Sequence, residues 1–281
     1  MKIAVTGASG QLGTAFCSYL HKSNYSWEAF SSSQWDITSK AQSEDLMTNG
    51  NYDILINCAA YTDVERAEDD PQNCFKINAY ALTNLSELCE KKQTLLVHFS
   101  TDYVFDGETN LPYVEDDKPN PINVYGESKL EGEKIIKSSG CKYFIGRLSW
   151  LFGGSSSSFT SKLEVWRKKS KNLKVSSDEI STPTFSYHIP HLIFKAIQSE
   201  ILGLFHINSS GWCSRFDWAK FYSQSLSWSD TNISPAPMAS FQMKARRPAF
   251  SVLSNALFQK KTSLRIPHWK AAVTDSIDSA R

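Results

Sequence analysis

The first half of the chain alternates short apolar runs with longer segments of helical periodicity. The runs at residues 54–56 and 95–97 are continuously apolar, as expected of parallel strands that helices cover on both faces. This alternation predicts an α/β fold with a doubly wound parallel sheet. The expected strands are residues 2–6, 27–30, 54–58, 95–100 and 143–151, and the expected helices are residues 14–22, 71–91 and 125–138.

The regular alternation ends near the serine run at residues 155–158, where aromatic, serine-rich and proline-rich segments take over. We therefore expect a larger domain over residues 1–150 and a smaller one over residues 151–281, with some segments of the second half returning to the sheet. The aromatic stretch at residues 212–228 has helical spacing and no polar constellation, which predicts packed core rather than a binding site.

Composition excludes several classes of function. The 281 residues carry 30 Lys and Arg against 29 Asp and Glu, a net charge of +1, so no long-range field favours nucleic acid or an anionic membrane as a partner. Six scattered cysteines include no Cys-x-x-Cys pair, which predicts reduced, mostly buried thiols and no metal site. No apolar run approaches the roughly 20 residues of a membrane span, and the first strand leaves no room for a signal peptide, so we expect a cytoplasmic protein.

The most specific motif is a glycine-rich turn directly after the first strand. The first glycine permits a sharp turn, the second lets backbone approach a pyrophosphate, and the third lets helix and strand pack tightly, while the helix N-terminus attracts the phosphate charge. A plain strand-to-helix turn is the alternative, but the position after a strand favours a dinucleotide-binding Rossmann turn. Its expected cofactor contacts are Gly7, Ser9, Gly10, Gln11, Leu12 and Gly13.

The residues after the second strand bear on which dinucleotide binds. The strand ends at Phe30 with neither the acid that favours a free ribose hydroxyl nor the arginine that favours a 2′-phosphate. Ser31 could hydrogen-bond a 2′-phosphate, although a serine run is as often a solvated loop. The prediction is NADPH or NADH, with a mild preference for NADPH. Asp36 and Ile37 are expected near the adenine, and the alternative for Asp36 is a cap on the helix that begins near Ser39.

Tyr125 and Lys129 lie four residues apart in a helical segment, which places the phenol and the ammonium on one face. A nearby cation favours phenolate, so we expect Lys129 to lower the pKa of Tyr125 toward the range useful for proton transfer. A packed ring beside a surface charge is the alternative. Thr101, at the end of a strand, is expected to hold a substrate carbonyl, because ligands bind outside the carboxyl ends of parallel strands.

Together these motifs resemble the dTDP-4-dehydrorhamnose reductase family, within the extended short-chain dehydrogenases/reductases. The matching segments are residues 7–13, 57–68, 78, 100–107, 125–129, 147–150 and 247–248, which extend through most of the chain. The resemblance implies an oxidoreductase that uses NADPH or NADH to reduce the C4 keto group of dTDP-4-dehydro-L-rhamnose for polysaccharide biosynthesis. It also implies that residues 151–281 mainly bind the nucleotide-sugar substrate.

The resemblance implies roles residue by residue. The catalytic set would be Thr101, Tyr125 and Lys129. Tyr125 and Lys129 would also contact the cofactor, with Lys129 holding the nicotinamide ribose. The further cofactor contacts that it implies are Ala59, Ala60, Tyr61, Asn78 and Ser100. The substrate contacts that it implies are Thr62, Val64, Thr101, Asp102, Tyr103, Trp150 and Arg247. For Arg247 the alternative is a surface charge in a basic loop beside Lys244 and Arg246.

Two departures from the family pattern stand beside two alternative functions. Some members bind Mg²⁺ at a dimer interface through an early acid in the first helix, whereas residues 14–16 here are Thr, Ala and Phe, so we expect no metal site and either a monomer or a homodimer. Leu148 stands where the family usually has Thr, which removes one polar contact.

One alternative function is a reductase or epimerase of another nucleotide-linked 4-keto-deoxysugar. The other is a non-catalytic regulatory subunit resembling the methionine adenosyltransferase β subunit, against which Thr101 and Trp150 argue.

Overall fold

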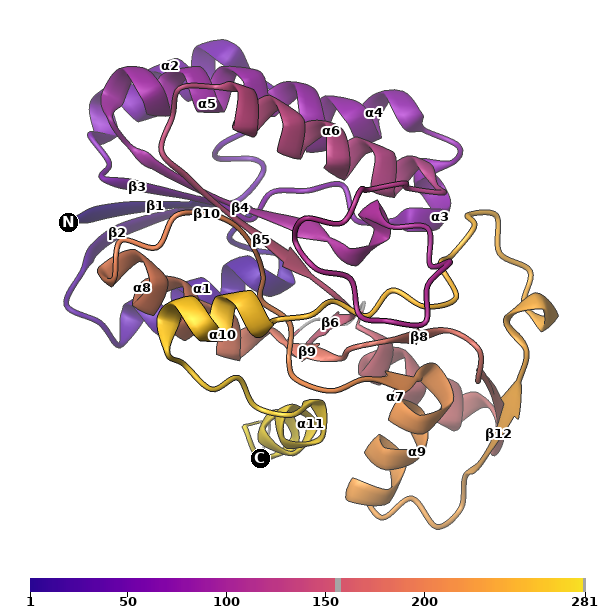
Figure 1. Ribbon diagram of the computed structural model, residues 1–281. Helices are drawn as coiled ribbons and strands as arrows, with labels where there is room; N and C mark the ends of the chain where they lie inside the picture. The colour runs from indigo at the N-terminus through magenta and orange to yellow at the C-terminus, as the bar shows by residue number, and fades with distance from the viewer. Residues whose placement is uncertain (155–157, 280–281) are drawn as a thin grey trace.

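The computed structural model describes residues 1–154 and 158–279. Its central sheet has six parallel strands in the order β10-β5-β4-β3-β1-β2, which confirms the predicted doubly wound α/β fold (Figure 1). The strands are β1 (Lys2–Thr6), β2 (Ser26–Phe30), β3 (Ile54–Asn57), β4 (Leu95–Thr101), β5 (Tyr143–Leu148) and β10 (Gly203–His206). The expected strand 143–151 is too long, because Trp150 has a left-handed φ of 39° and separates β5 from β6 (Leu151–Phe152).

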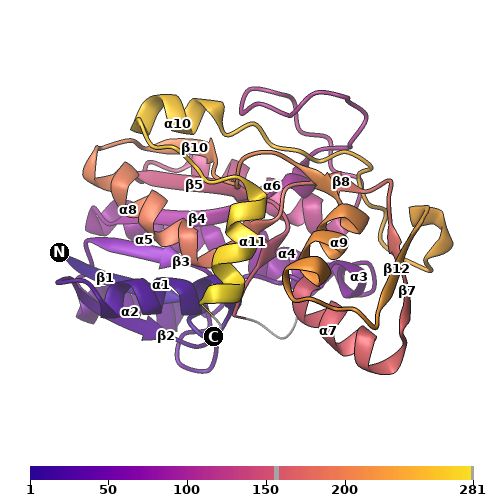
Figure 2. The same cartoon turned by 90° about the horizontal axis from the view of Figure 1, so that it is seen from below.

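Helices cover both faces of the sheet (Figures 1 and 2). One face packs against α1 (Gln11–His21), α8 (Ile189–Gln198) and α10 (Ala256–Thr262), and the other against α2 (Lys40–Gly50), α5 (Ala81–Lys92) and α6 (Val124–Ser138). Each face buries its own apolar cluster: Phe16 and Phe194 belong to the first, and Met47 and Leu85 to the second. Strand β3 is buried along its whole length, which explains its continuously apolar start.

Two of the expected helices begin or end elsewhere. Helix α1 starts at Gln11 because Gly10 is its N-cap. The expected helix 71–91 is divided into α4 (Pro71–Phe75), the π-helical turn η1 (Lys76–Tyr80) and α5, and the short α3 (Val64–Ala67) precedes them. Asn78 lies in the π-helical turn and hydrogen-bonds to α6. The irregular turn therefore points one buried polar side chain toward the neighbouring helix.

The carboxyl ends of β1 and β3 form the switch point of the sheet. Strand β1 pairs with β2 on one side and with β3 on the other, and the helices that follow β1 and β3 lie on opposite faces. In an open α/β sheet the ligand crevice lies outside this point. The 3-10 turn η2 (Asp102–Val104) follows β4 next to it. This edge of the sheet is therefore where a site is expected.

A smaller body of structure, with its own apolar cluster, lies beside the carboxyl ends of the strands (Figure 2). Its helices are α7 (Phe159–Lys169), α9 (Arg215–Ser225) and α11 (Trp269–Asp278). Its strands pair as β7 (Asn172–Ser176) with β12 (Asn232–Ala236), β8 (Ile180–Ser181) with β11 (Cys213–Ser214), and β6 with β9 (Thr184–Phe185). The remaining 3-10 turns are η3 (Ser186–His188) and η4 (Met238–Ser240). Trp218 and Tyr222 are buried in this cluster, as predicted for the stretch 212–228, whereas Trp212 is 52% exposed.

The second half of the chain contributes to both bodies, since α8, β10 and α10 pack on the sheet. Part of the serine run at the expected domain change, residues 155–157, lies outside the described residues.

All six cysteines are free thiols and four are buried, as predicted. No helix within residues 1–154 and 158–279 is long and apolar enough to cross a bilayer. The same ranges hold no cluster of three or more His, Cys, Asp or Glu side chains able to bind a metal ion.

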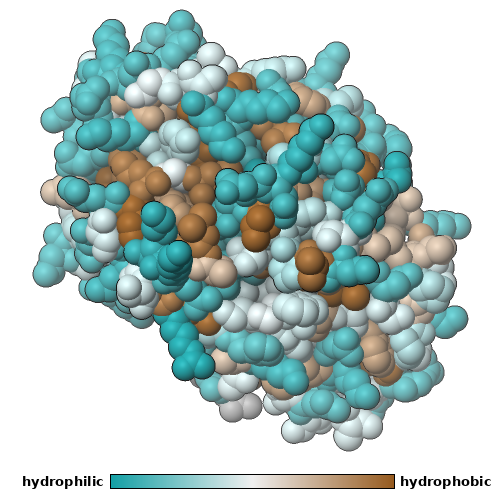
Figure 3. Space-filling model, in the orientation of Figure 1, coloured by the Kyte–Doolittle hydropathy of each residue, from teal (hydrophilic) through white to brown (hydrophobic). Residues whose placement is uncertain are grey.

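Apolar side chains gather over the β10 edge of the sheet on the face shown in Figure 3. Leu202, directly before β10, is 39% exposed, and Leu257 on the neighbouring α10 is 36% exposed. Polar side chains cover most of the surrounding surface. The edge strand is therefore flanked by apolar side chains that solvent reaches.

Candidate active site

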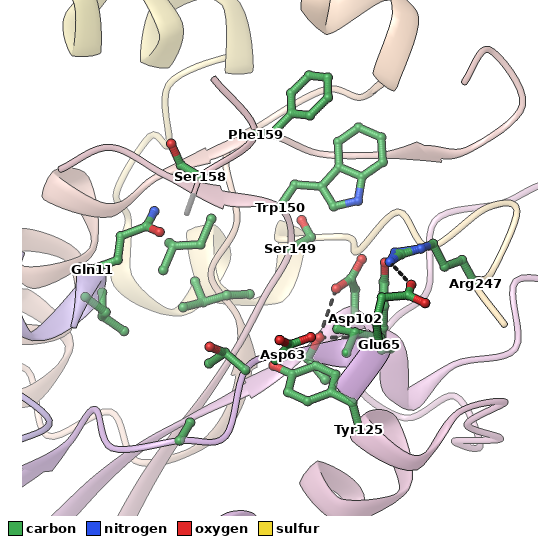
Figure 4. A pocket seen from close by; sticks show the side chains of 18 of the residues that line it. Gln11, Asp63, Glu65, Asp102, Tyr125, Ser149, Trp150, Ser158, Phe159 and Arg247 are labelled. Carbon is green, nitrogen blue, oxygen red and sulfur yellow. Dashed lines mark hydrogen bonds and ion pairs between the residues drawn. The ribbon is translucent and has the colours of Figure 1, made fainter. Parts of the chain in front are cut away.

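A cleft of about 940 Å³ opens at the carboxyl ends of β1, β3, β4 and β5. The sheet side contributes residues 9–12, 57–60, 99–103 and 148–149, together with Tyr125 and Lys129 of α6, and Trp150 and Leu151 follow toward the smaller body. The smaller body contributes residues of α7, β7 and α9. Figure 4 shows Gln11 and Arg247 on opposite sides of the view, with Tyr125 and Trp150 between them. One continuous cleft therefore joins the glycine turn to the smaller body.

The glycine turn forms a cradle in which the positions of Gly7 and Gly13 leave no room for a Cβ. Gly7 has a φ of 64°, and a Cβ there would lie 2.5 Å from the backbone nitrogen of Ala59. A Cβ on Gly13 would lie 2.2 Å from the carbonyl oxygen of Gly7. Gly10 and Gln11 line the cleft, with Ser9 and Leu12 beside them. Gly7 and Gly13 thus determine the packing of the turn, while the residues between them face the cleft.

The start of α1 has the features of an anion site. Gly10 makes no side-chain cap, and the first turn of the helix contains no acidic residue, so the first N–H groups remain available. The Nε2 atom of Gln11 is buried and has no hydrogen-bond partner among the described residues. A buried amide without a partner is costly unless a ligand supplies an acceptor. The turn and this orphaned amide fit the pyrophosphate of a dinucleotide.

The residues after β2 lie outside the lining of the cleft. Ser31 Oγ donates a hydrogen bond to Gln34 Oε1 at 2.9 Å. Asp36 accepts a hydrogen bond from the backbone N–H two residues later, and Ile37 is 4% exposed. Ser39 is the N-cap of α2, so the capping alternative for Asp36 is wrong. The contacts of Ser31, Asp36 and Ile37 with a cofactor stay a prediction.

The segment after β3 brings Ala59 and Ala60 into the cleft. Asn78 lies behind them: its Oδ1 accepts from the backbone N–H of Tyr61 at 2.8 Å, and its Nδ2 donates to the carbonyl oxygen of Tyr61 and to Ser128 Oγ, both at 3.0 Å. Neither Asn78 nor Tyr61 lines the cleft. Asn78 therefore holds the cleft wall against α6, and the cofactor contacts of Asn78 and Tyr61 that the resemblance implies stay a prediction.

Lys129 is 2% exposed, so the alternative of a surface charge beside a packed ring is wrong. Its Nζ lies 3.4 Å from His98 Nε2, and burial lowers its pKa to about 8. Burial and the Asp102 carboxylate raise the pKa of the Tyr125 phenol, against the opposing hydrogen bond of Thr101. The expected lowering of the Tyr125 pKa by Lys129 is therefore wrong for this structure, because desolvation of the phenol dominates.

Thr101 and Asp102 lie at the carboxyl end of β4. Asp102 is 2% exposed, and its carboxylate accepts hydrogen bonds from Thr101 at 3.0 Å, Ser181 at 3.0 Å and Ser251 at 2.5 Å. Burial raises the pKa of Asp102 to about 6, with these hydrogen bonds opposing the rise. Ser100 Oγ, also in the cleft lining, is buried without a partner among the described residues. Asp102 thus ties β4 to two distant segments and fixes Thr101 beside them.

Trp150 lies between the two bodies and is held in an unusual backbone conformation. Its φ of 39° is rare for a bulky residue, and such strain persists where the surroundings fix it. Its ring stacks on Trp218 with 5.8 Å between centroids, and its Nε1 is buried without a described partner. Trp150 therefore presents a ring and an unused donor at the cleft.

Arg247 reaches the cleft from the segment after η4. Its Nη2 donates to Glu65 Oε1 at 2.5 Å and its Nε donates to Met243 Sδ at 3.0 Å. The side chain is 17% exposed and lines the cleft, so the alternative of a surface charge is wrong. The other substrate contacts that the resemblance implies, which also line the cleft, are Thr62, Val64 and Tyr103.

Several cleft residues escaped the sequence analysis. The largest group comes from the smaller body: Lys162, Lys174, Glu179 and Arg215. Ser214 and Asp217 form a capping box at the start of α9, and this pattern was readable in the sequence. It predicts where the helix begins, but nothing local places the first turn of that helix against Trp150.

The comparisons with known proteins agree with this arrangement. The family model described as the RmlD substrate binding domain matches residues 1–281. The curated dTDP-4-dehydrorhamnose reductase of Mycolicibacterium smegmatis is 29% identical over 98% of this chain and 85% of its own length. The spore coat polysaccharide biosynthesis protein SpsK of Bacillus subtilis is 31% identical over 98% of this chain and 96% of its own.

Solved structures extend the agreement to the whole fold. A dTDP-4-dehydrorhamnose reductase from Clostridium acetobutylicum superposes with a TM-score of 0.95 at 33% identity, covering 100% of this chain and 99% of that one. The Bacillus anthracis enzyme in complex with NADP has a TM-score of 0.95 at 32% identity, with 99% of each chain covered. On these matches, the chain belongs to the RmlD substrate binding domain family.

Proposed function

We propose that this chain is a reductase of dTDP-4-dehydro-L-rhamnose that uses NADPH or NADH and forms dTDP-L-rhamnose. The observation that carries the proposal is that Tyr125 and Lys129 line the same cleft as the glycine turn. The names of the relatives support the substrate, and the NADP complex of the Bacillus anthracis enzyme supports the cofactor class.

The sheet side of the cleft would hold the dinucleotide. The N–H groups at the start of α1 and the side chain of Gln11 would bind its pyrophosphate, Ala59 and Ala60 would line its path, and Lys129 would hold the nicotinamide ribose. Ser100 has an unused hydroxyl on the same side. When bound, the nicotinamide supplies the hydride that reduces C4 of the sugar.

The chain's own residues would handle the proton. The raised pKa of Tyr125 keeps the phenol protonated at neutral pH, so its hydroxyl can donate to the C4 oxygen as negative charge develops there. Lys129, whose pKa is near 8, can then return a proton to the phenolate. Thr101 Oγ1 would orient the carbonyl by a hydrogen bond, at the cost of weakening its present bond to Asp102. Proton donation of this kind contributes roughly 10²–10⁴-fold in rate.

The substrate side would enclose the sugar and exclude water. Its proposed contacts are Thr62, Val64, Asp102, Tyr103, Trp150 and Arg247. We further propose that residues 1–150 mainly bind the cofactor and residues 151–281 mainly bind substrate. The protein would act in the cytoplasm as a monomer or homodimer, without a nucleic acid or membrane partner.

The deciding experiment follows oxidation of NADPH and of NADH by the purified protein. The substrate is made in the cuvette from dTDP-4-keto-6-deoxyglucose by a 3,5-epimerase. Oxidation that requires the epimerase is the expected result, and the two rates give the cofactor preference. Oxidation without the epimerase would instead assign another 4-keto sugar. Cofactor binding without oxidation of either substrate would contradict a catalytic role and favour a regulatory subunit.

A further inference from the structure

Arg215 is a cation fixed in the cleft that the proposed chemistry leaves without a task. It is the first residue of α9, where the Ser214 capping box fixes the helix start, and its backbone N–H donates to the carbonyl oxygen of Glu179 at 3.2 Å. Its guanidinium carbon lies 3.7 Å from the ring centroid of Trp150 and 5.1 Å from that of Phe159. The side chain is 17% exposed. Stacking and helix geometry therefore hold the guanidinium in place before any ligand arrives.

The hydrogen-bonding capacity of this guanidinium is mostly unused. Among the described residues it makes one side-chain hydrogen bond, from Nη2 to Glu179 Oε1 at a long 3.5 Å. An arginine carries several N–H donors in a fixed fork. Arg215 lines the wall of the cleft. A partly buried cation with unused donors favours an anionic ligand.

The other cations of the cleft fit an anion less well. Arg247 already donates to Glu65 and Met243 through two of its nitrogens. Lys129 lies beside His98 and belongs to the catalytic set. Lys162 and Lys174 are exposed, so a contact with either would be more strongly screened and would cost side-chain entropy. Arg215 is the cation that is both fixed and available.

Within a nucleotide sugar, the diphosphate is the anionic group, and its oxygens match the planar fork of arginine. The acidic residues that line the cleft are Asp63, Glu65, Asp102 and Glu179, and their carboxylates would repel that group unless a cation faced it. We propose that Arg215 binds the diphosphate of the substrate, with its guanidinium held by stacking on Trp150. This inference rests on the proposed function, which supplies the nucleotide-sugar substrate and its diphosphate.

The test compares binding of dTDP with binding of thymidine, because the two differ only in the diphosphate. We expect Arg215→Met to weaken dTDP roughly 10- to 100-fold, as for loss of a hydrogen bond to a charged group. Arg215→Lys should recover part of this loss, since it keeps the charge and loses the fork. Thymidine and NADPH affinities should stay within about twofold of wild type in both variants.

Arg167→Met is the matched control. Arg167 also packs on an aromatic ring, 4.4 Å from the centroid of Trp228, and pairs with Asp230 at 3.0 Å, but it does not line the cleft. Its loss should leave the affinity ratio of dTDP to thymidine unchanged. An unchanged ratio in Arg215→Met and Arg215→Lys, with NADPH binding intact, would overturn the proposal.

Glu179→Gln supplies an independent arm. The variant removes the carboxylate that pairs with Arg215 and repels phosphate. The affinity for dTDP should therefore rise severalfold, while the affinity for thymidine should not change. Weaker dTDP binding in this variant would contradict the proposal that the diphosphate replaces Glu179 as the partner of Arg215. If the wild type binds UDP in preference to dTDP, the assigned nucleotide fails, and the same contrast between UDP and uridine still decides the role of Arg215.

Discussion

The two halves of the cleft are built in different ways. In the cofactor half, the site proposed for the pyrophosphate depends on one continuous stretch, in which β1, the turn at residues 7–13 and α1 follow one another along the chain. The substrate half is assembled from distant segments: Ser251 donates to Asp102 across 149 positions, and Arg247 to Glu65 across 182. A local motif can therefore bind the group that many enzymes share, whereas long-range packing forms the part that distinguishes substrates.

The largest effect is expected where the two halves meet, at Tyr125. Replacing it with Phe removes the proposed proton donor and keeps the ring, which packs edge-on against Tyr103 with 6.1 Å between centroids. We expect turnover to fall roughly 10²–10⁴-fold while NADPH affinity changes little. Steady-state kinetics and NADPH titration check this. Full activity in Tyr125→Phe would remove the proposed mechanism, and loss of NADPH binding would mean that Tyr125 belongs to the cofactor half alone.

The parts of the structure that local geometry determines were predictable from the sequence. The parallel sheet and the glycine turn were predictable because strand patterning and steric limits on glycine act within a few residues. The positions of Tyr125 and Lys129 on one helical face follow from the helical repeat. The carboxyl ends of parallel strands meet at one edge, which also placed Thr101 at the cleft.

The features that tertiary packing determines were not predictable from the sequence. Arg215 opens a helix whose aromatic residues are mostly core, and only the folded chain stacks it on Trp150. The expected direction of the Tyr125 pKa was wrong because burial and Asp102 are properties of the assembled site. Asn78 matched a family segment, but its hydrogen bonds to Tyr61 and to Ser128 of α6 depend on the π-helical turn, which no local pattern in the sequence predicts.

The second prediction separates packing from binding within the cofactor half. Gly13→Ala would place a Cβ 2.2 Å from the Gly7 carbonyl oxygen, so we expect a loss of about 1–3 kcal/mol in the free energy of unfolding. Gly10 lines the cleft, and Gly10→Ala would place its Cβ at 3.2 Å from the same oxygen, so this variant should reduce NADPH affinity with little change in stability. Denaturant unfolding and NADPH titration measure the two effects. Equal losses of stability would contradict the division of roles.

The third prediction addresses the long-range anchor of the substrate half. The pKa of Asp102 is about 6 in the fold against about 3.9 unfolded, so its ionised form is disfavoured in the native state. The resulting loss of folding stability is fully present above the folded-state pKa, and it disappears as the pH falls toward the pKa of the unfolded state. Relative to Asp102→Asn, the wild type should therefore gain about 1 kcal/mol of stability between about pH 7 and about pH 5. Unfolding of both proteins at each pH measures this difference, and a relative loss on acidification would contradict it.

The smallest effect is expected at Ser31, the one proposed cofactor contact that would distinguish NADPH from NADH. Its hydroxyl now donates to Gln34 and lies 2.9 Å from the hydroxyl of Ser33, so it would exchange one hydrogen bond for another when it meets a 2′-phosphate. Such an exchange is worth roughly 0.5–1.5 kcal/mol. Ser31→Ala should therefore weaken NADPH severalfold and leave NADH unchanged, which makes NADH the internal control. Equal changes in the affinities for both cofactors would mean that the turn after β2 does not bind the 2′-phosphate. The cofactor half would then bind the dinucleotide without recognising its 2′-phosphate, and the contrast between the local glycine turn and the long-range substrate half would be sharper than the sequence predicts.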